Sequence, residues 1–264
     1  MNLHDFIPGL AYRTVSLFGF SPETGEEWRA AYEMLLRCFD RIGIKPNTIT
    51  ADGAPGLSDE SMPIDVWRTW IARHEFPVPL MLAAGSGYFG RLNVRTPWLH
   101  TRVHGNISTY SEGGRFIFVS DAALDRWMPE AYSAIARDAW SVRPFEYGYA
   151  HTHADPMRFA AGSAELNDEL RWKWQIFTIE MQRGGARHSE RLRDVFPLNY
   201  LIDSHLSFQL GEQTLGEWIT ASQARGLLTN LERGLWCWSV PESRIPHVRA
   251  ALEPSGLLVA PGGS

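Results

Sequence analysis

The sequence predicts an α+β fold, with a mixed or largely antiparallel β-sheet and helices packed on it. Strand-like and helix-like segments are interleaved irregularly, without the regular alternation of a doubly wound sheet. Glycine turns at Gly113-Gly114 and at Gly234 separate strand-like runs and predict hairpins. The 264 residues can bury a large core, and no stretch has the composition of a linker. We therefore expect a single α+β domain over 1–264.

The N-terminal part begins with a strand over 11–20, which is rich in aromatic and β-branched residues. A helix follows, with Ser21 or Thr24 as its N-cap, an apolar stripe at helical spacing, and Gly43 at its end. The next predicted elements are a short strand at 44–49, a loop at 51–61 and a short helix at 65–74 that carries Trp67 and Trp70.

Two strands at 88–94 and 98–103 are expected next, and a third at 115–119. Ser120 or Asp121 is the expected N-cap of a long helix over 122–140, after which residues 145–151 form a strand. Phe145, Tyr147 and Tyr149 alternate along that strand and should share one face. The order strand, capped helix, strand thus occurs twice, which suggests two similar β-α-β units as a pseudo-repeat within 11–150.

The C-terminal part is predicted to hold a helix at 165–181 and a short helix at 214–221 with Thr214 as its cap. A hairpin with its turn at Gly234, a helix and a final strand then form one element over 226–260. Trp236 and Trp238 flank Cys237 on the second hairpin strand and should share its core face.

Composition excludes several function classes. The net charge is −5 and is spread evenly: 14 basic and 17 acidic residues fall in 1–150, and 11 and 13 in 151–264. This argues against nucleic-acid binding, which usually shows a basic domain or stripe. No segment approaches the ~20 apolar residues of a membrane span, and the N-terminus lacks a signal-peptide pattern. Cys38 and Cys237 are expected as buried free thiols, which fits a cytoplasmic protein.

Short catalytic and cofactor motifs are weak in this chain. Gly85 to Gly90 matches G-x-G-x-x-G, but a strand or loop ended by Pro97 follows it rather than the helix that a pyrophosphate needs. It is interpreted as a flexible turn, and no cofactor is expected. His151 and His153 would share a strand face, with Asp155 as a third ligand, so these three residues are the candidates for a metal site. The alternative interpretation is a polar strand end.

Two features suggest protein–protein contact. The 51–65 segment holds four acidic residues and no basic one: Asp52, Asp59, Glu60 and Asp65. It is either a solvated loop or an acidic arm that faces a basic partner. Most of the 11 tryptophans lie on predicted core stripes, but Trp172 and Trp174 cannot both lie on one helix face. One of the two is therefore a candidate surface anchor.

The C-terminal part carries a family resemblance. The strings Asp194–Leu201, Ser204–Leu206, Thr214–Ile219 and Gly226–Thr229, followed by Gly234–Trp238, resemble bacterial immunity proteins encoded beside type VI secretion effectors and other polymorphic toxins. Tyr147–Ala150 is similar to an element that precedes this pattern in such proteins. The resemblance covers roughly residues 110–260 in order of elements. It implies a cytoplasmic, non-enzymatic protein that binds a cognate toxin, and it assigns no binding residues.

The leading hypothesis is an immunity protein that occludes the active site of its cognate toxin in the cytoplasm, with no nucleic-acid or membrane partner. One alternative is a metal-dependent hydrolase that uses His151, His153 and Asp155. Another is an immunity protein that enzymatically reverses the damage done by the toxin. The partner-binding candidates are Asp52, Asp59, Glu60 and Asp65, with Trp172 and Trp174.

Overall fold

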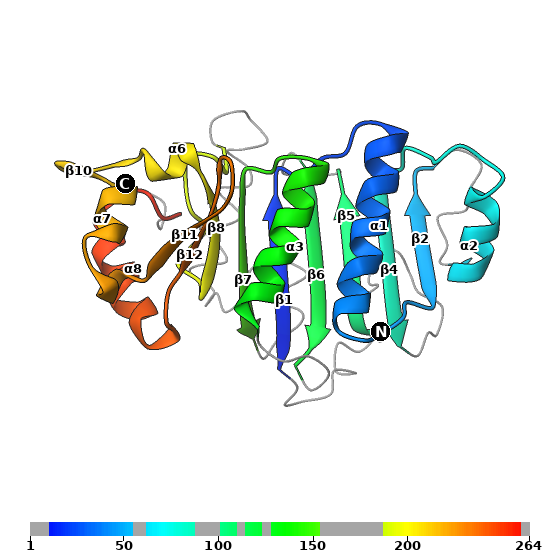
Figure 1. Cartoon of the computed structure of the whole chain (residues 1–264), viewed down its shortest axis with the longest axis horizontal. Coiled ribbons are helices and arrows are strands. Elements are labelled where there is room, and N and C mark those ends of the chain that lie inside the picture. The colour runs from blue at the N-terminus through cyan, green and yellow to red at the C-terminus, as the bar shows by residue number, and fades with distance from the viewer. Residues whose placement is uncertain are drawn as a thin grey trace.

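A ten-stranded antiparallel β-sheet forms the centre of the structure (Figure 1). The computed structural model describes residues 11–54, 62–87, 101–109, 114–122, 128–153 and 187–259. Within these ranges every pair of neighbouring strands in the sheet is antiparallel, and six α-helices accompany the strands. The α+β fold class predicted from the irregular interleaving of elements is therefore confirmed.

The order of the strands in the sheet differs from their order in the chain. Along the sheet the order is β11-β12-β8-β7-β1-β6-β5-β4-β2-β3. The N-terminal strand β1 thus lies in the middle, between β6 and β7. The strands are β1 (Tyr12–Phe18), β2 (Thr48–Asp52), β3 (Met62–Pro63), β4 (Met81–Gly87), β5 (Thr101–Ser108), β6 (Arg115–Asp121), β7 (Tyr147–His153), β8 (Leu198–Ile202), β11 (Leu227–Glu232) and β12 (Leu235–Ser239).

The described helices differ widely in length. The two long helices are α1 (Gly25–Arg41) and α3 (Pro129–Val142), and the shorter ones are α2 (Ile64–Ile71), α6 (Asp203–Leu206), α7 (Leu215–Thr220) and α8 (Ile245–Leu252). A two-stranded ribbon, β9 (Gln209–Leu210) and β10 (Gln213–Thr214), lies between α6 and α7 in the chain. Among the described helices, none is long and apolar enough to span a bilayer.

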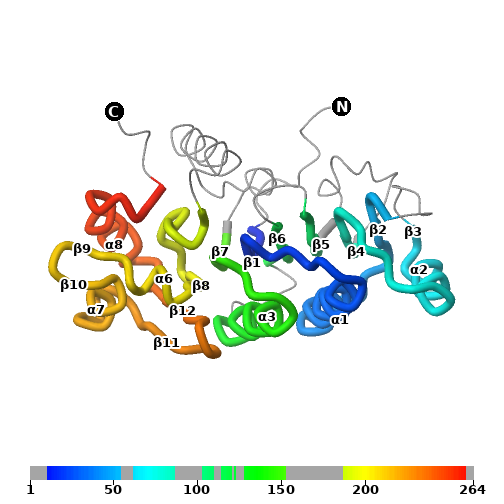
Figure 2. The backbone as a smooth tube through the Cα atoms, turned by 90° about the horizontal axis from the view of Figure 1, so that it is seen from above, coloured from blue at the N-terminus to red at the C-terminus, as the bar shows by residue number. Residues whose placement is uncertain are grey.

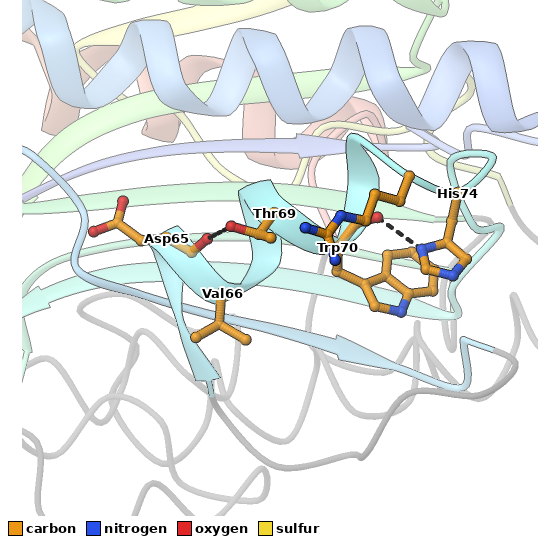
Figure 3. Close-up of a pocket in the computed structure, with 6 residues that line it drawn as sticks. Asp65, Val66, Thr69, Trp70 and His74 are labelled. Atoms are coloured by element: carbon orange, nitrogen blue, oxygen red, sulfur yellow. Dashed lines mark hydrogen bonds between the residues drawn. The ribbon is translucent and has the colours of Figure 1, made fainter.

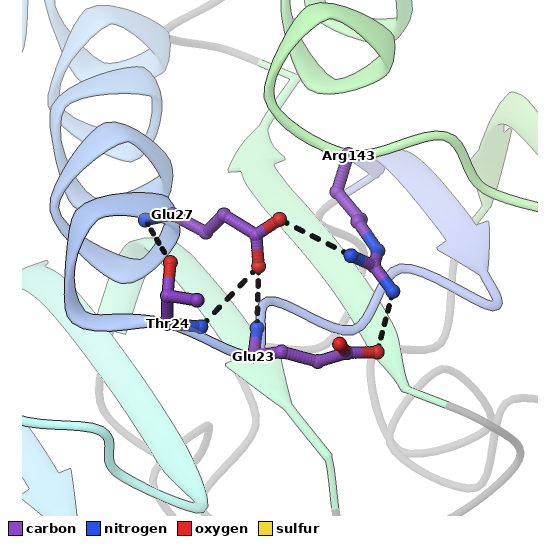
Figure 4. Close-up of polar contacts among 4 residues, drawn as sticks. All are labelled: Glu23, Thr24, Glu27 and Arg143. Atoms are coloured by element: carbon purple, nitrogen blue, oxygen red, sulfur yellow. Dashed lines mark hydrogen bonds and ion pairs between the residues drawn. The ribbon is translucent and has the colours of Figure 1, made fainter.

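The first turn of α1 is fixed by a capping box and tied to the end of α3 (Figure 4). Thr24 is the N-cap, its hydroxyl accepts the Glu27 N–H at 3.1 Å, and the Glu27 carboxylate accepts the Thr24 N–H. These bonds satisfy two of the N–H groups that every helix start leaves without a partner. Arg143, just after α3, donates to the carboxylates of both Glu23 and Glu27. Of the two predicted caps, Thr24 is thus the correct one.

Apolar side chains fill both faces of the sheet. On one face, α1 and α3 lie across the strands (Figure 2), and Trp28, Leu35 and Phe39 of α1 pack with Val15 and Phe118 of the sheet. On the other face, a second cluster joins Phe18, Tyr147 and Trp238 to α7 and α8. Strand β1 is buried on both faces: six of its seven residues are buried, including the polar Thr14 and Ser16.

Several predicted boundaries were wrong. The strand predicted at 44–49 begins at Thr48, after Pro46, which has no N–H to give to a ladder. Ser120 and Asp121 are the last residues of β6 rather than helix caps. Helix α3 begins at Pro129, whose fixed φ suits the first helical position. Phe145 precedes β7 and packs edge-on against Trp140, on the face opposite Tyr147 and Tyr149.

The predicted C-terminal elements fit the structure better. The 226–240 hairpin is β11 and β12, and Thr214 caps α7 with Glu217 completing a capping box. Trp236 and Trp238 share one face and Cys237 lies on the other, where it reaches the cluster beneath α3. The predicted last strand is reduced to a bridge between Leu258 and Leu192.

Other predictions stay predictions. The expected strand at 88–94 and helix at 165–181 lie outside the described residues, as does the segment between Ala122 and Met128. The structure contains both strand–helix–strand connections, β1-α1-β2 and β6-α3-β7. These connections do not show that the two units are similar to each other. The single domain over 1–264 and the pseudo-repeat within 11–150 therefore stay predictions.

Candidate functional site: a groove beside helix α2

Helix α2 lies at one end of the sheet, directly after the short edge strand β3. The Ile64 N–H donates to the Asn47 carbonyl at 3.0 Å, so the helix starts beside the first residues of β2. Ile64 and Trp67 are buried and Ile71 packs against the core, which fixes one face of the helix inward. The opposite face is therefore held at the surface by the packing of these three residues.

A shallow groove of about 480 Å³ runs along this outer face (Figure 3). Its described lining consists of Asp65, Val66, Thr69, Trp70, Arg73 and His74. Val66 is 55% exposed although it is aliphatic, and Trp70 is half-buried. Val66 and Trp70 are four residues apart and lie on the same side of α2, and Arg73 and His74 follow just after the helix ends.

The rings of this stripe form a stack that is anchored in the core. Trp70 lies between Trp67, with ring centroids 5.8 Å apart, and His74, 4.4 Å apart, and both pairs are nearly parallel. Trp67 in turn packs edge-on against Tyr32 and Phe76. The His74 ring is also fixed by a 2.8 Å hydrogen bond between its Nδ1 and the Trp70 carbonyl. Trp70 is thus held by its neighbours, so little side-chain entropy remains to be lost when a partner covers it.

The rim of the groove is charged. Asp65 lies in the first turn of α2, where the helix dipole favours a carboxylate, and its side chain is 89% exposed. Arg68 approaches it at 3.4 Å, an exposed pair of the kind that contributes little to stability. Arg73 also lines the groove. Anchored aromatic side chains with charged residues beside them are a composition found at protein interfaces.

The structure separates the described members of the predicted acidic arm. Asp65 comes directly after Ile64, whose N–H is bonded to Asn47, the residue that precedes β2. Asp52 is the last residue of β2 and lies at the other end of that strand. Asn47 and Asp52 are five residue steps apart along this extended segment, which is about 16 Å. Asp59 and Glu60 lie outside the described residues, as do Trp172 and Trp174. Of the two candidates that the structure describes, Asp65 lines the groove and Asp52 does not.

Among the described residues, the structure brings no further metal ligand next to the predicted candidates His151 and His153. His151 is buried in β7, and its ring lies 5.1 Å from that of Phe196. His153 ends β7, and Asp155 lies outside the described residues. Among the residues that the structure describes, no three His, Cys, Asp or Glu side chains gather as a metal site requires. Of the Gly85–Gly90 motif, Gly85 to Gly87 belong to β4 and pair with β5, so this part is strand rather than the predicted turn, and residues 88–90 lie outside the described residues.

A buried polar cluster lies under the 187–196 segment. The Arg193 guanidinium lies 4.8 Å above the Phe18 ring and donates to the Tyr149 hydroxyl at 3.2 Å. Asp194 accepts two hydrogen bonds from Arg249, at 2.7 and 2.8 Å. Arg193 and Asp194 are less than a tenth exposed, so this cluster attaches the segment to the sheet rather than offering a surface to a ligand.

The two cysteines are unsuited to nucleophilic catalysis. Both are buried and unbridged, as predicted. Burial raises the pKa of the Cys38 thiol to about 12 and that of the Cys237 thiol to about 11. Since the thiolate is the reactive form, both side chains stay protonated and unreactive at neutral pH.

The sequence contains a signal for the groove that is not a catalytic or cofactor motif. The helix predicted at 65–74 carries one apolar stripe through Trp67 and another through Val66 and Trp70. A short helix at the end of a sheet can bury only one of two such stripes. The choice of stripe depends on the contacts of Trp67 with Tyr32 and Phe76, which are distant in sequence from each other.

Comparison with known proteins gives a likeness of fold. No protein-family model matches the chain, and a search of curated proteins finds no significant match. Among solved structures, the chain is similar to the Pseudomonas aeruginosa T6SS protein PA0821, where T6SS denotes the type VI secretion system. The TM-score is 0.57 at 12% sequence identity, and the alignment covers 97% of this chain and 76% of that one. At this identity the similarity establishes a shared fold.

Proposed function

We propose that this chain is an immunity protein that binds a cognate toxin of the type VI secretion system and neutralises it in the cytoplasm. The fold likeness to a T6SS protein, which extends over 97% of the chain, is the observation that carries the proposal. The C-terminal strings that resemble immunity proteins support it independently, because they rest on residues and not on the fold.

The groove beside α2 is the toxin-binding face in this proposal. Trp70 provides a large apolar surface that is already held in place, and Val66 extends it. Aromatic residues in such positions carry much of the energy of protein interfaces. Asp65 and Arg73 at the rim would select a partner of complementary charge and orient it. Binding there neutralises the toxin by covering its active site, with no reaction catalysed by this chain.

The proposal predicts that α2 variants lose toxin binding while the fold survives. Trp70→Ala removes the anchor and Val66→Lys places a charge on the apolar surface, so each should weaken the complex by about tenfold or more. The measurement is affinity for the toxin encoded by the neighbouring gene, together with rescue of growth on co-expression. The matched control is Met128→Lys, a charge at another exposed apolar residue (48% exposed) just before α3.

The possible results test the immunity function separately from the position of the toxin-binding face. A folded Trp70→Ala protein with full affinity would remove the groove from the interface. If the product of the neighbouring gene is not toxic, or no complex forms at micromolar concentration, the immunity function itself is wrong.

A further inference from the structure

Several polar groups of the α2 groove already have partners within the chain. The Thr69 hydroxyl donates to the Asp65 carbonyl at 2.8 Å. Nδ1 of His74 is bonded to the Trp70 carbonyl, also at 2.8 Å. The Asp65 carboxylate, in the first turn of the helix, has the Arg68 guanidinium 3.4 Å away. Arg68 therefore offsets part of the negative charge at this end of the groove.

The charge of Arg73, by contrast, is not balanced within the described part of the chain. Arg73 lines the groove just after α2 ends, about 12 Å from Asp65 at the rise of a helix. It is exposed, and no carboxylate of the described residues forms an ion pair with it, that of Glu75 two positions later included. This end of the groove therefore offers a positive charge to a partner.

The stacking of Trp70 favours the same kind of partner. The Trp70 ring lies between His74 and Trp67, with interplanar angles of 14° and 17°, so neither of its faces is fully open. A cation of the partner would need such an open face. The edge of an aromatic ring is electropositive, and that of tryptophan carries the Nε1–H donor. Trp70 is thus better matched to an oxygen acceptor than to a basic group.

We propose that the groove receives an aspartate or glutamate of the toxin, whose carboxylate pairs with the Arg73 guanidinium. An apolar side chain next to that acidic residue covers Trp70 and Val66. Charge complementarity selects this partner, because the described lining holds a guanidinium without a counter-ion beside an aromatic ring. A guanidinium binds a carboxylate through two parallel hydrogen bonds, which fix its orientation as well as its position. This pairing rests on the proposed function, since the toxin supplies the carboxylate.

Burial of the apolar surface strengthens the pair. When the toxin covers Val66 and Trp70, water is removed from around Arg73, so the attraction between the opposite charges increases. A basic residue of the toxin at this position would instead face a like charge, which disfavours binding. At the other end of the groove, Asp65 remains compatible with a basic residue of the toxin.

Charge reversal at Arg73 tests the pairing, with the toxin encoded by the neighbouring gene as the probe. Arg73→Glu should raise the Kd by about 100-fold or more, because two carboxylates then face each other. Arg73→Lys keeps the charge but loses the paired hydrogen bonds, so the Kd should rise by about three- to tenfold. The matched control is Arg137→Glu, the same reversal at an exposed arginine of α3, which should leave the affinity nearly unchanged.

A scan of the toxin identifies the carboxylate. Each aspartate and glutamate of the toxin is changed to arginine in turn, and each variant is titrated against the wild-type chain and against Arg73→Glu. One toxin variant should bind Arg73→Glu about tenfold or more tightly than the unchanged toxin does, and should bind the wild-type chain more weakly. The circular dichroism spectrum and melting temperature show that every variant is folded.

The results distinguish the pairing from the groove and from the function. A folded Arg73→Glu chain that binds the toxin as tightly as the wild type overturns the pairing. So does a scan in which no change of a toxin carboxylate restores binding to that variant. If Trp70→Ala loses binding while Arg73→Glu keeps it, the pairing alone is wrong and the groove remains the toxin-binding face. If the wild-type chain forms no complex, the proposed function is wrong and the pairing with it.

Discussion

At the scale of single residues, His205 shows how a buried polar group is held in this fold. Its Nδ1 accepts the Ile202 N–H at 3.3 Å, so its Nε2 carries the proton and donates to the His188 carbonyl at 2.7 Å. The neutral ring thereby joins the end of β8 to the segment that precedes it. Burial lowers the pKa of His205 to about 4 and that of His104, in β5, to about 3.

These two histidines predict acid sensitivity. The pKa values of both histidines in the folded chain lie below the unfolded value of about 6.5. As the pH falls through about 6.5 towards 4, the unfolded chain therefore binds more protons than the folded chain. Stability should be fully present above pH 7 and should decline by about 2 kcal/mol per histidine between pH 7 and 5. Denaturant unfolding at several pH values measures this, and His205→Gln should make the slope shallower. A stability independent of pH between 7 and 5 would contradict the prediction.

Some residue-scale features could be predicted from sequence. The pattern Thr-x-x-Glu occurs at Thr24–Glu27 and at Thr214–Glu217, and both are capping boxes in the structure. By contrast, the burial of His205 and Arg193 depends on segments that meet only in the folded chain. No local pattern distinguishes these side chains from exposed ones.

At the scale of elements, Gly105 of β5 lies directly against Leu35 of α1. A Cβ added there would overlap the Leu35 side chain of α1 and lie 3.3 Å from the Phe118 ring. The absence of a side chain at this position lets α1 approach the sheet. The periodicity of α1 predicted its buried stripe, but its partner on β5 could not be identified from sequence.

Gly105→Ala should therefore force α1 away from the sheet and lower the free energy of unfolding by about 1–3 kcal/mol. The control is Gly216→Ala in α7, where an added Cβ meets atoms at 3.4 Å or more. That change should be neutral or stabilise by about 0.4–1 kcal/mol, because alanine restricts the unfolded chain. Thermal or denaturant unfolding compares the two, and equal stabilities for both variants would refute this account of the packing.

At the scale of the whole molecule, the fold class was predictable and the strand order was not. Glycine turns and irregular interleaving indicate an antiparallel α+β fold, and these are local signals. The position of β1 between β6 and β7 depends on pairing between residues more than a hundred positions apart, such as Val15 with Phe118. Likewise, the sequence predicts Asp65 as a contact residue. It does not predict the groove around Asp65, because the groove depends on which face of α2 packs against the core.

For the whole molecule, the proposed function is neutralisation of a type VI secretion toxin by binding. The most direct test is to titrate the purified chain into the toxin encoded beside its gene while the toxin's activity is measured. Occlusion predicts that inhibition is complete when the two proteins are equimolar and that it is lost in parallel with binding. Undiminished toxin activity at excess chain, or full protection by a small fraction of an equivalent, would contradict neutralisation by binding.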